Sequence, residues 1–351
     1  METVNPTEPT PTRIAILGAT GYGGGELLRL LLQHPRVDVV AATSRSREGM
    51  PVGHVHRNLH GWTDLAFSSP TADWIAENAD IAIGAMPHGA SAETLAPLVD
   101  TGQRVIDLSG DFRLRDARDY AHWYRREHPR PDLLEHAVYG CPELEGDTIA
   151  TARLVASPGC FATALNLAML PAAAAGLLRG RPQVVAMTGS SGSGAEARPT
   201  THHPERAATL RPYKVLAHQH VPEVMQLLAD AGSPVDGIDF TPVSAPIVRG
   251  ILAIVSAELA DPDARPEDLY REFYAESPFV KVLDDREPEV ASIAGSNYVE
   301  VRARRTPDGR LHAVCAIDNL VKGAAGQAVQ SLNRMIGAPE ELGLTWPGMW
   351  P

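Results

Sequence analysis

Cys160 is the side chain of this sequence best placed to act as a nucleophile. It follows the Pro158-Gly159 turn that ends an apolar stretch, and it precedes a long segment rich in Ala and Leu. The pattern predicts a strand, a turn and then a helix, with the cysteine in the first helical turn. The free N–H groups and the positive dipole end of a helix favour a thiolate there. The structural alternative is a buried cysteine that serves as a small hydrophobic residue.

A cysteine nucleophile needs a base, and the segment 218–223 (HQHVPE) supplies candidates. Histidine titrates in the pH range that such a base requires. His218 and His220 are two residues apart and Glu223 follows three residues later, so the segment offers a base and a carboxylate to orient it. Two histidines also suit a metal ion, but the Cys and His residues lack the repeated spacing of a zinc site. We therefore predict no metal site.

A glycine-rich turn follows the first predicted strand, at residues 18–25 (GATGYGGG). Glycines at the first, fourth and seventh positions let the backbone approach a pyrophosphate at a helix N-terminus. A tight turn with a purely structural role is the alternative. The candidate cofactor ligands of this turn are Gly18, Thr20, Gly21, Tyr22, Gly23 and Gly24.

The end of the second predicted strand indicates which dinucleotide is bound. A site for NAD usually carries an acidic residue there, which binds the ribose hydroxyls. This chain has Ser44, Arg45, Ser46 and Arg47 instead. Hydroxyls and arginines suit a 2′-phosphate, so the sequence favours NADPH. A solvated basic loop is the alternative.

Three further loops follow predicted strands, at the edge where open α/β sheets bind ligands. The first contains Pro87 and His88, and the second, residues 109–113 (SGDFR), contains Arg113. We expect them to contact cofactor or substrate, although His88 and Arg113 also suit capping roles. The third loop is rich in Gly and Ser and includes Ser190 and Gly192. Its backbone N–H groups suit an oxyanion or a phosphate.

These segments belong to two halves with different patterns. The first alternates continuous apolar strands with helices, which indicates a parallel sheet covered on both faces. Its strands are predicted at residues 13–18, 37–43, 80–86 and 104–109. After Cys160 the strands are longer, alternate with polar residues and include a hairpin at 306–309 (TPDG), which indicates an antiparallel sheet. The predicted fold class is an α/β Rossmann-type domain followed by an α+β domain with an antiparallel sheet.

Composition excludes several classes of protein. The chain has 351 residues, of which 44% are hydrophobic and 21% charged, and a net charge of -12. This balance argues against nucleic acid or an anionic membrane as a partner. Three scattered cysteines form no disulfide or metal framework, which fits a cytoplasmic location. Residues 1–12 are polar and rich in Pro and Thr, so we predict a disordered tail.

Together these motifs resemble the N-acetyl-γ-glutamyl-phosphate reductase family, and the resemblance extends from residue 13 to 351. It rests on the glycine-rich turn, the PHG and SGDFRL loops, HQHVPE, Arg249-Gly250 and residues 155–171 and 318–327. The resemblance implies an NADP-binding Rossmann domain (13–158), an α+β catalytic domain (159–318) and a C-terminal helix returning to the first domain (319–351). It also implies a homotetramer or homodimer.

The resemblance further implies a mechanism. Cys160 would attack an acyl phosphate to form a thioester, and NADPH would reduce that thioester to a semialdehyde. His218 would be the acid/base, with His220 and Glu223 orienting it or binding substrate. The other implied roles are substrate binding by Arg113, Ser157, Lys214 and Arg249, and nicotinamide contacts by Asn319 and Lys322.

Residues 195–211 resemble one branch of this family more than the other. That branch acts in lysine or arginine synthesis on a substrate tethered to a small acidic amino-group carrier protein of the LysW type. Arg198, Arg206 and Arg211 would suit such a carrier. The sequence leaves open whether the substrate is glutamyl or aminoadipyl phosphate and whether its amino group carries acetyl or the carrier. Two other hypotheses are an aspartate-semialdehyde-dehydrogenase-like enzyme and a non-catalytic NADP-binding regulator.

Overall fold

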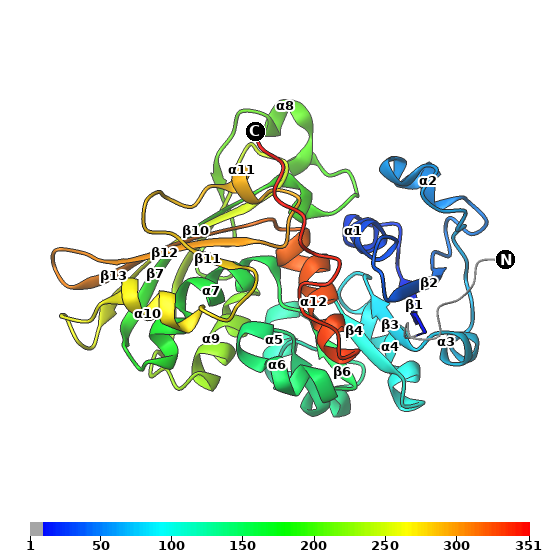
Figure 1. The fold of residues 1–351 in the computed structure, drawn as a ribbon, viewed down its shortest axis with the longest axis horizontal. Helices are drawn as coiled ribbons and strands as arrows, with labels where there is room; N and C mark the ends of the chain where they lie inside the picture. Colours follow the sequence, from blue (N-terminus) through cyan, green and yellow to red (C-terminus); the bar gives the residue numbers. More distant parts are fainter. Residues whose placement is uncertain (1–9) are drawn as a thin grey trace.

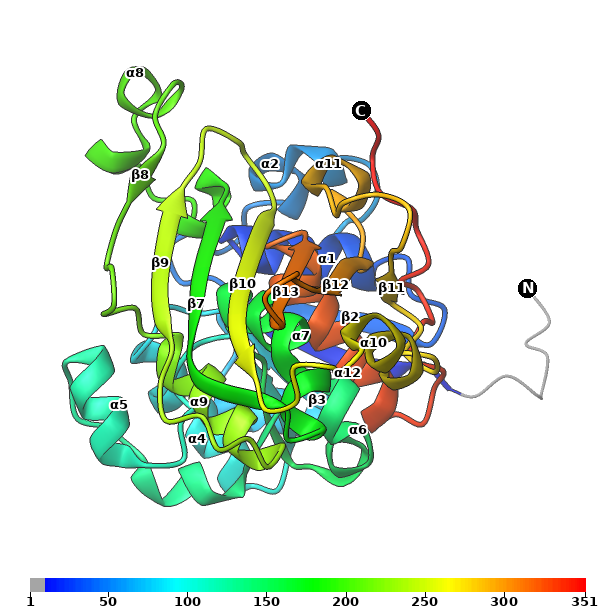
Figure 2. The same ribbon diagram turned by 90° about the vertical axis from the view of Figure 1, so that its left-hand side faces the viewer.

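The computed structural model describes residues 10–351, and its chain is built around two β-sheets (Figures 1 and 2). The first sheet has six strands in the order β2-β1-β3-β4-β6-β5, all parallel. Its strands are β1 (Thr12–Leu17), β2 (Val37–Ala42), β3 (Ile81–Gly84), β4 (Arg104–Asp107), β5 (Ala137–Tyr139) and β6 (Leu154–Ala156). Thr12 therefore belongs to a strand, whereas most of the predicted tail, residues 1–9, lies outside the described residues.

Helices cover both faces of this sheet, which is why the inner parts of its strands are apolar at consecutive positions. Along β1, Ile14 and Ile16 pack into one core, and Ala15 and Leu17 pack into another on the opposite face. Alternate residues of a strand point to opposite faces, so a strand covered on both sides needs no polar positions. The helices here are α1 (Tyr22–Leu31), α2 (Val52–Val55), α3 (Ala72–Asn78), α4 (Ala90–Asp100), α5 (Ala117–Tyr124) and α6 (Pro142–Thr151).

The second sheet has seven strands in the order β11-β12-β13-β10-β7-β9-β8. The predicted antiparallel pairing holds at its centre, but β7 pairs with β9, and β11 with β12, in parallel, so the sheet is mixed. Its strands are β7 (Leu178–Thr188), β8 (Arg211–Pro212), β9 (Asp239–Ser244), β10 (Ile251–Leu259), β11 (Val280–Val282), β12 (Val299–Arg305) and β13 (Arg310–Ile317).

Helix α7 (Cys160–Ala174) is the central helix of the second domain. It packs against β10 and β13 and also contacts α9 and α10. Because neighbours surround it, its sequence is apolar on all sides rather than on one stripe. The helix ends at Ala174, since Gly176 takes a φ of +64° and the chain turns into β7. The remaining helices are α8 (His203–Arg206), α9 (Val221–Asp230), α10 (Pro266–Phe273) and α11 (Val290–Ile293).

The chain then returns to the first domain. The predicted C-terminal helix begins as a π-helical turn, η5 (Val321–Ala325), and continues as α12 (Gly326–Met335). Helix α12 packs against α1 and α6 (Figure 1). Its apolar residues Val329 and Leu332 join the same core as Ile14. This return places residues 318–326 at the junction of the two domains.

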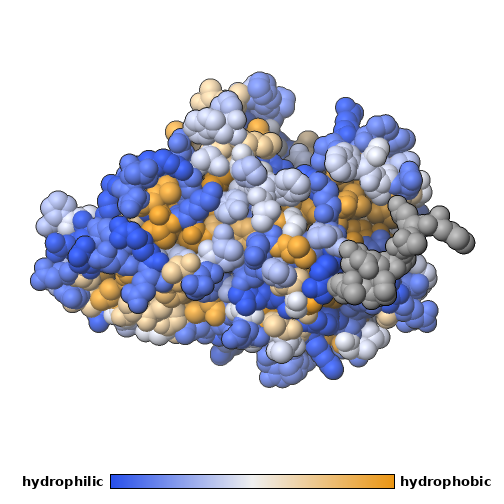
Figure 3. All heavy atoms as spheres, in the orientation of Figure 1, coloured by the Kyte–Doolittle hydropathy of each residue, from blue (hydrophilic) through white to orange (hydrophobic). Residues whose placement is uncertain are grey.

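The surface agrees with a globular protein of mixed composition. The face drawn in Figure 3 is largely hydrophilic with scattered hydrophobic patches. Within residues 10–351, no helix combines the length and hydropathy needed to cross a membrane.

Candidate active site

Cys160 is the first residue of α7, at the point where the first sheet passes into the second domain. Strand β6 ends at Ala156 beside Asp107 of β4, and the turn 157–159 leads into the helix. Gly159 is the N-cap residue and has no side chain to cap the helix. Its N–H group instead donates to Oε2 of Glu223, at 2.9 Å. The predicted strand, turn and helix thus place Cys160 at a helix N-terminus that a carboxylate from α9 caps.

The Glu223 carboxylate organises this region. Besides Gly159, it accepts hydrogen bonds from Arg113 Nη1 at 3.1 Å and from the Tyr139 hydroxyl at 3.2 Å. Glu223 is completely buried and Arg113 is 5% exposed. Arg113 and Tyr139 belong to the first domain and Gly159 lies at the domain junction. One buried carboxylate therefore fixes these three segments relative to α9.

Arg113 is held by the protein through all three of its guanidinium nitrogens. In addition to the Glu223 contact, Nε donates to the Ser157 carbonyl at 2.8 Å and Nη2 donates to the Leu108 carbonyl at 2.7 Å. Burial alone would lower the pKa of Arg113, but the Glu223 charge raises it above the ordinary value. Arg113 therefore supplies a fixed positive charge close to Cys160.

Two histidine rings lie beside the start of α7. A Cβ atom on Gly159 would lie 2.4 Å from Nε2 of His220, so the ring rests directly against the residue before Cys160. The His220 Nε2 atom is 3.9 Å from Glu223 Oε1, and its Nδ1 is buried with no hydrogen-bond partner among residues 10–351. The His218 ring lies edge-on to His220, with centroids 4.7 Å apart, and its Nδ1 accepts the His220 N–H.

Burial sets the protonation of these groups. It lowers the pKa of His218 to about 2 and that of His220 well below its ordinary value, so both rings are neutral at pH 7. Burial also raises the pKa of the Cys160 thiol to about 11, although Arg113 and the Phe161 N–H act in the opposite direction. The helix end that was expected to favour a thiolate is therefore outweighed by desolvation. The predicted role of Cys160 as a nucleophile therefore requires a neutral base beside it.

This protonation state predicts how Cys160 reacts with iodoacetamide. For a thiol with a pKa of about 11, the fraction present as thiolate rises about tenfold for each pH unit below that value. We expect the alkylation rate of Cys160 in the free enzyme to rise steadily between pH 7 and pH 9. Mass spectrometry distinguishes Cys160 from the buried Cys141 and Cys315. A rate that levels off below pH 8 would show a thiolate already formed and contradict the prediction.

The loops after β3 and β4 brace each other. His88 Nδ1 accepts the Gly110 N–H at 2.7 Å. Asp111, which sequence analysis did not single out, accepts the N–H groups of Gly89 and Ala92 at the start of α4. Pro87 and His88 are exposed, so their expected contact with cofactor stays a prediction. Ser157, predicted to bind substrate, is completely buried, and its hydroxyl has no partner among the described residues.

The glycine-rich turn fits a dinucleotide. Gly18 has a φ of +78°, and a Cβ on Gly24 would lie 2.6 Å from the Ala19 backbone. Nothing lies within 4 Å of the Cβ position of Gly21, the N-cap of α1, so the helix N-terminus opens onto free space. Open N–H groups at a helix start suit a pyrophosphate. His56 donates from Nε2 to the Ala19 carbonyl at 2.8 Å and braces this turn.

The remaining cofactor candidates lie at two strand ends. Ser44 is buried after β2, whereas Arg45 and Ser46 are exposed. At the other site, Asn319 Nδ2 donates to Ser191 Oγ at 3.0 Å, and Asn319 Oδ1 accepts the Gly250 N–H at 2.6 Å. Asn319 therefore ties the loop containing Ser190 and Gly192 to the loop before β10.

Lys322 does not lie where it was predicted. Its side chain is completely buried, and Nζ donates to Glu143 Oε1 at 2.6 Å and to Gln330 Oε1 at 2.7 Å. An ammonium enclosed in this way cannot contact nicotinamide, so the prediction of a cofactor ligand is wrong. Only tertiary packing brings Glu143 to this lysine.

Arg249 and Lys214, two cationic side chains predicted to bind substrate, have partners within the protein. Arg249 forms ion pairs with Glu26 of α1 and, at 3.3 Å, with Asp318. Lys214, in a left-handed conformation with φ of +44°, donates from Nζ to Gln219 Oε1 at 2.7 Å. Their binding of substrate stays a prediction.

The three arginines predicted to dock a carrier differ in accessibility. Arg206 is buried and donates to the Ala245 carbonyl, so its docking role is wrong. Arg198 is exposed and pairs with Glu196 at 3.1 Å. Arg211 is half-buried and donates to the Thr200 carbonyl at 3.3 Å. Within residues 10–351 there is no group of three or more His, Cys, Asp or Glu side chains that could hold a metal ion.

Comparison with known proteins assigns a family to each half of the chain. Residues 13–152 match the semialdehyde dehydrogenase NAD-binding domain, and residues 160–319 match the semialdehyde dehydrogenase dimerisation domain. A putative [LysW]-L-2-aminoadipate 6-phosphate reductase of Thermomicrobium roseum is 46% identical, covering 96% of this chain and 99% of the relative. An N-acetyl-gamma-glutamyl-phosphate reductase of Methanopyrus kandleri is 44% identical with the same coverage.

Solved structures agree on the fold. Aspartate semialdehyde dehydrogenase II of Vibrio cholerae aligns with a TM-score of 0.73 at 19% identity, covering 94% of this chain and 99% of that one. The enzyme of Candida albicans with NADP aligns with a TM-score of 0.69 at 13% identity, covering 93% of this chain and 98% of that one. At such low identity the likeness concerns the fold alone, and it confirms the predicted fold class.

Proposed function

Since the chain belongs to the semialdehyde dehydrogenase family, among relatives named N-acetyl-γ-glutamyl-phosphate reductases and LysW-linked phosphate reductases, we propose that it reduces an N-blocked acyl phosphate to a semialdehyde. The observation that carries the proposal is the position of Cys160, at a helix N-terminus beside two neutral histidines and the buried Arg113–Glu223 pair. This is an oxidoreductase activity, and the predicted resemblance is confirmed.

The reaction proceeds through a thioester. The Cys160 sulfur attacks the acyl carbon, the bond from that carbon to the phosphate oxygen breaks, and phosphate leaves. The nicotinamide cofactor, when bound, supplies the hydride that reduces the thioester carbon. The resulting thiohemiacetal loses its C–S bond, which gives the semialdehyde and returns the electron pair to sulfur. The Arg113 charge and the N–H groups at the start of α7 stabilise negative charge that develops at the acyl oxygen.

His220 is the proton carrier that the geometry supports best, in place of His218. The His220 ring rests against Gly159, next to Cys160, and its Nδ1 is free of partners within residues 10–351. His218 Nδ1 is occupied by the His220 N–H. A neutral His220 takes the thiol proton during attack, and the Glu223 carboxylate, 3.9 Å from Nε2, stabilises the cation that forms.

NADPH is the proposed form of the cofactor because the end of β2 carries Arg45 rather than an acidic residue. We expect Arg45→Ala to raise the KM for NADPH by roughly tenfold, the loss of one charge-assisted contact to phosphate, with little change for NADH. Steady-state kinetics with both cofactors measure the effect. Arg57→Ala, which removes an exposed arginine that follows α2, is the control. An unchanged preference in Arg45→Ala would refute this role.

The relatives of this chain include reductases named for two forms of substrate. A relative named for a LysW-linked substrate is 46% identical to this chain, and one named for an N-acetylated substrate is 44% identical. Arg198 is exposed and Arg211 is half-buried, so both can contact a carrier protein. Arg206 is buried, so only two of the three predicted arginines are available for docking. We propose the carrier-linked substrate because of the segment 195–211, with free N-acetylglutamyl phosphate as the alternative.

One assay separates these substrates. NADP reduction in the presence of phosphate is measured on N-acetylglutamate semialdehyde and on a carrier-linked glutamate or aminoadipate semialdehyde. Activity confined to the carrier-linked compounds supports the proposal. Activity on the free acetyl compound assigns the enzyme to the other branch. Activity on neither, but on aspartate semialdehyde, would favour the enzyme whose fold it shares, and no activity would favour a non-catalytic NADP-binding protein.

A homo-oligomer is also part of the proposal. Figure 2 shows strands β7, β9 and β10 with no helix in front of them. On that side of the sheet Val185 is 43% exposed, while Met187, Leu252 and Ile254 are half-buried. An uncovered apolar sheet face favours pairing with a second copy. Light scattering coupled to gel filtration distinguishes a dimer from a tetramer.

A further inference from the structure

The π-helical turn η5 forms a wall of the Cys160 site. A Cβ atom on Gly323 would lie 2.8 Å from the Cys160 Cβ and 3.2 Å from its Cα, so the turn contacts the cysteine through backbone. The Gly323 N–H donates to the Asp318 carbonyl at 2.9 Å. Asn319, two residues before this turn, ties two loops of the second sheet together. A displacement of this turn therefore changes the space around the sulfur.

A buried ion pair holds the turn in place. Lys322 lies in η5, and its ammonium meets Glu143 of α6, which belongs to the first domain. The exposed fractions of the two side chains are 0% and 2%. Gln330 of α12 accepts from the same ammonium and donates to Glu143 at 3.3 Å. The turn is thus fastened to two helices that lie outside the catalytic domain.

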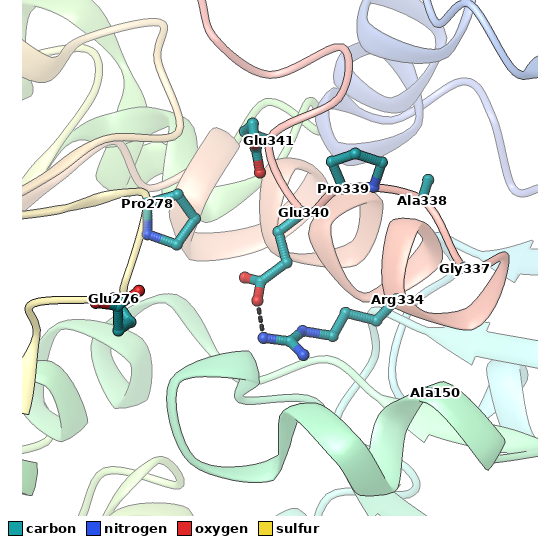
Figure 4. A pocket seen from close by; sticks show the side chains of 9 residues that line it. All are labelled: Ala150, Glu276, Pro278, Arg334, Gly337, Ala338, Pro339, Glu340 and Glu341. Atoms are coloured by element: carbon teal, nitrogen blue, oxygen red, sulfur yellow. Dashed lines mark hydrogen bonds and ion pairs between the residues drawn. The ribbon is translucent and has the colours of Figure 1, made fainter.

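The network continues to the protein surface. Gln330 Nε2 also donates to Glu340 Oε2 at 2.6 Å, and Glu340 pairs with Arg334 at the rim of a pocket of about 490 Å³ (Figure 4). Asn297 donates to Gln330 from the start of β12, at 3.1 Å. These contacts leave Lys322 and Glu143 little freedom to find other partners.

Stability alone does not account for such a pair. Taking two charges out of water is costly, and apolar residues of similar volume often serve folding equally well or better. A π-helical turn is itself rare and occurs most often at functional sites. A charged pair differs from an apolar one in being directional, since it specifies one arrangement of the atoms that it joins.

We propose that Lys322 is a positioning residue for Cys160: its bond to Glu143 fixes the turn Val321–Ala325 against Cys160 and so sets where the sulfur lies relative to His220 and the substrate. The effect on turnover rests on the proposed function. The effect on the cysteine itself does not.

Two variants test this role. Lys322→Met leaves the Glu143 carboxylate buried without its partner, so it is expected to lower thermal stability and yield. The double variant Lys322→Met/Glu143→Met removes both charges and is expected to recover most of that stability. In the double variant we expect kcat to remain lowered by roughly 100-fold, because misplacement of a reacting group by about 1 Å has an effect of that size. The KM for NADPH is expected to stay near the wild-type value.

The alkylation of Cys160 by iodoacetamide supplies a readout that needs no substrate. We expect the dependence of the Cys160 alkylation rate on pH in the double variant to differ from that of the wild type. The control is Arg286→Met, which deprives the buried Glu300 of β12 of its ion-pair partner, 2.8 Å away. It is expected to lose stability while its alkylation profile and kcat stay near wild type.

A double variant that regains stability together with a wild-type alkylation profile and kcat would overturn the proposal and leave Lys322 a purely structural residue. If the wild-type enzyme reduces no acyl phosphate, the proposed function fails. The alkylation profiles would still decide the role of Lys322.

Discussion

Replacing Cys160 by serine is expected to lower the reductase kcat by about 10⁴-fold or more while leaving the affinity for NADPH unchanged. A hydroxyl is a far weaker nucleophile than a thiol, and the ester that it would form resists hydride reduction. The residue sits in the first turn of α7, away from the glycine-rich turn that fits the dinucleotide. Stopped-flow measurement of turnover, and fluorescence titration with NADPH, give the two quantities.

The control for this prediction is a second free cysteine. Cys315 lies completely buried in β13, within the core of the second domain. Cys315→Ala is expected to keep turnover near wild type and to lose some stability, because it leaves a small cavity. Turnover like that of the wild type in Cys160→Ser would refute the thioester mechanism. Loss of NADPH binding in that variant would show that the cysteine supports the cofactor site instead.

Replacing Glu223 by glutamine is expected to have the second largest effect. The neutral amide keeps the shape of the side chain but leaves the buried Arg113 without its counter-charge. Breaking a buried pair in this way costs about 3–5 kcal/mol of unfolding free energy. The substitution also weakens the hydrogen bond from the Gly159 N–H to residue 223 and removes the negative charge beside His220. We therefore expect kcat to fall by roughly 10²- to 10³-fold. Chemical denaturation and steady-state kinetics measure the two changes.

Asp230→Asn is the matched control, because it lies on the same helix and also bridges to the first domain. Its carboxylate pairs with Arg115 at 2.7 Å, but the side chains are 25% and 52% exposed. An exposed pair of this kind contributes about 0–1 kcal/mol, and this one touches none of the site residues. We expect little change in stability and none in kcat. Equal losses in the two variants would mean that Glu223 acts only as a link between domains.

Local patterns were sufficient to identify the elements that carry the chemistry. The apolar run before Pro158-Gly159 and the Ala-rich segment after it predicted β6, the turn and α7. Steric rules for glycine likewise predicted the turn between β1 and α1, where Gly18 takes a positive φ. Helix α9 was missed, although Pro222 in its first turn is a start signal that would have placed Glu223 beside a helix N-terminus.

The partners of the buried charged side chains could not be predicted from the sequence, because they lie far away along the chain. Glu223 could be recognised as a carboxylate near two histidines, but not as the residue that fixes Arg113, 110 positions earlier. Lys322 stands in a motif that suggests a cofactor contact, yet Glu143, 179 positions away, encloses its ammonium. Arg206 looks like a surface arginine and is buried on the Ala245 carbonyl.

The sequence by itself determined the fold class, the glycine-rich turn and the position of Cys160 at the start of a helix. Each of these depends on interactions within a few residues, on the strand and helix periods and on glycine sterics. The tertiary structure decided the burial around Cys160, the positions of His218 and His220 beside the start of α7 and the enclosure of Lys322. These depend on desolvation and on charges from distant segments, which are set only when the two domains pack around the start of α7.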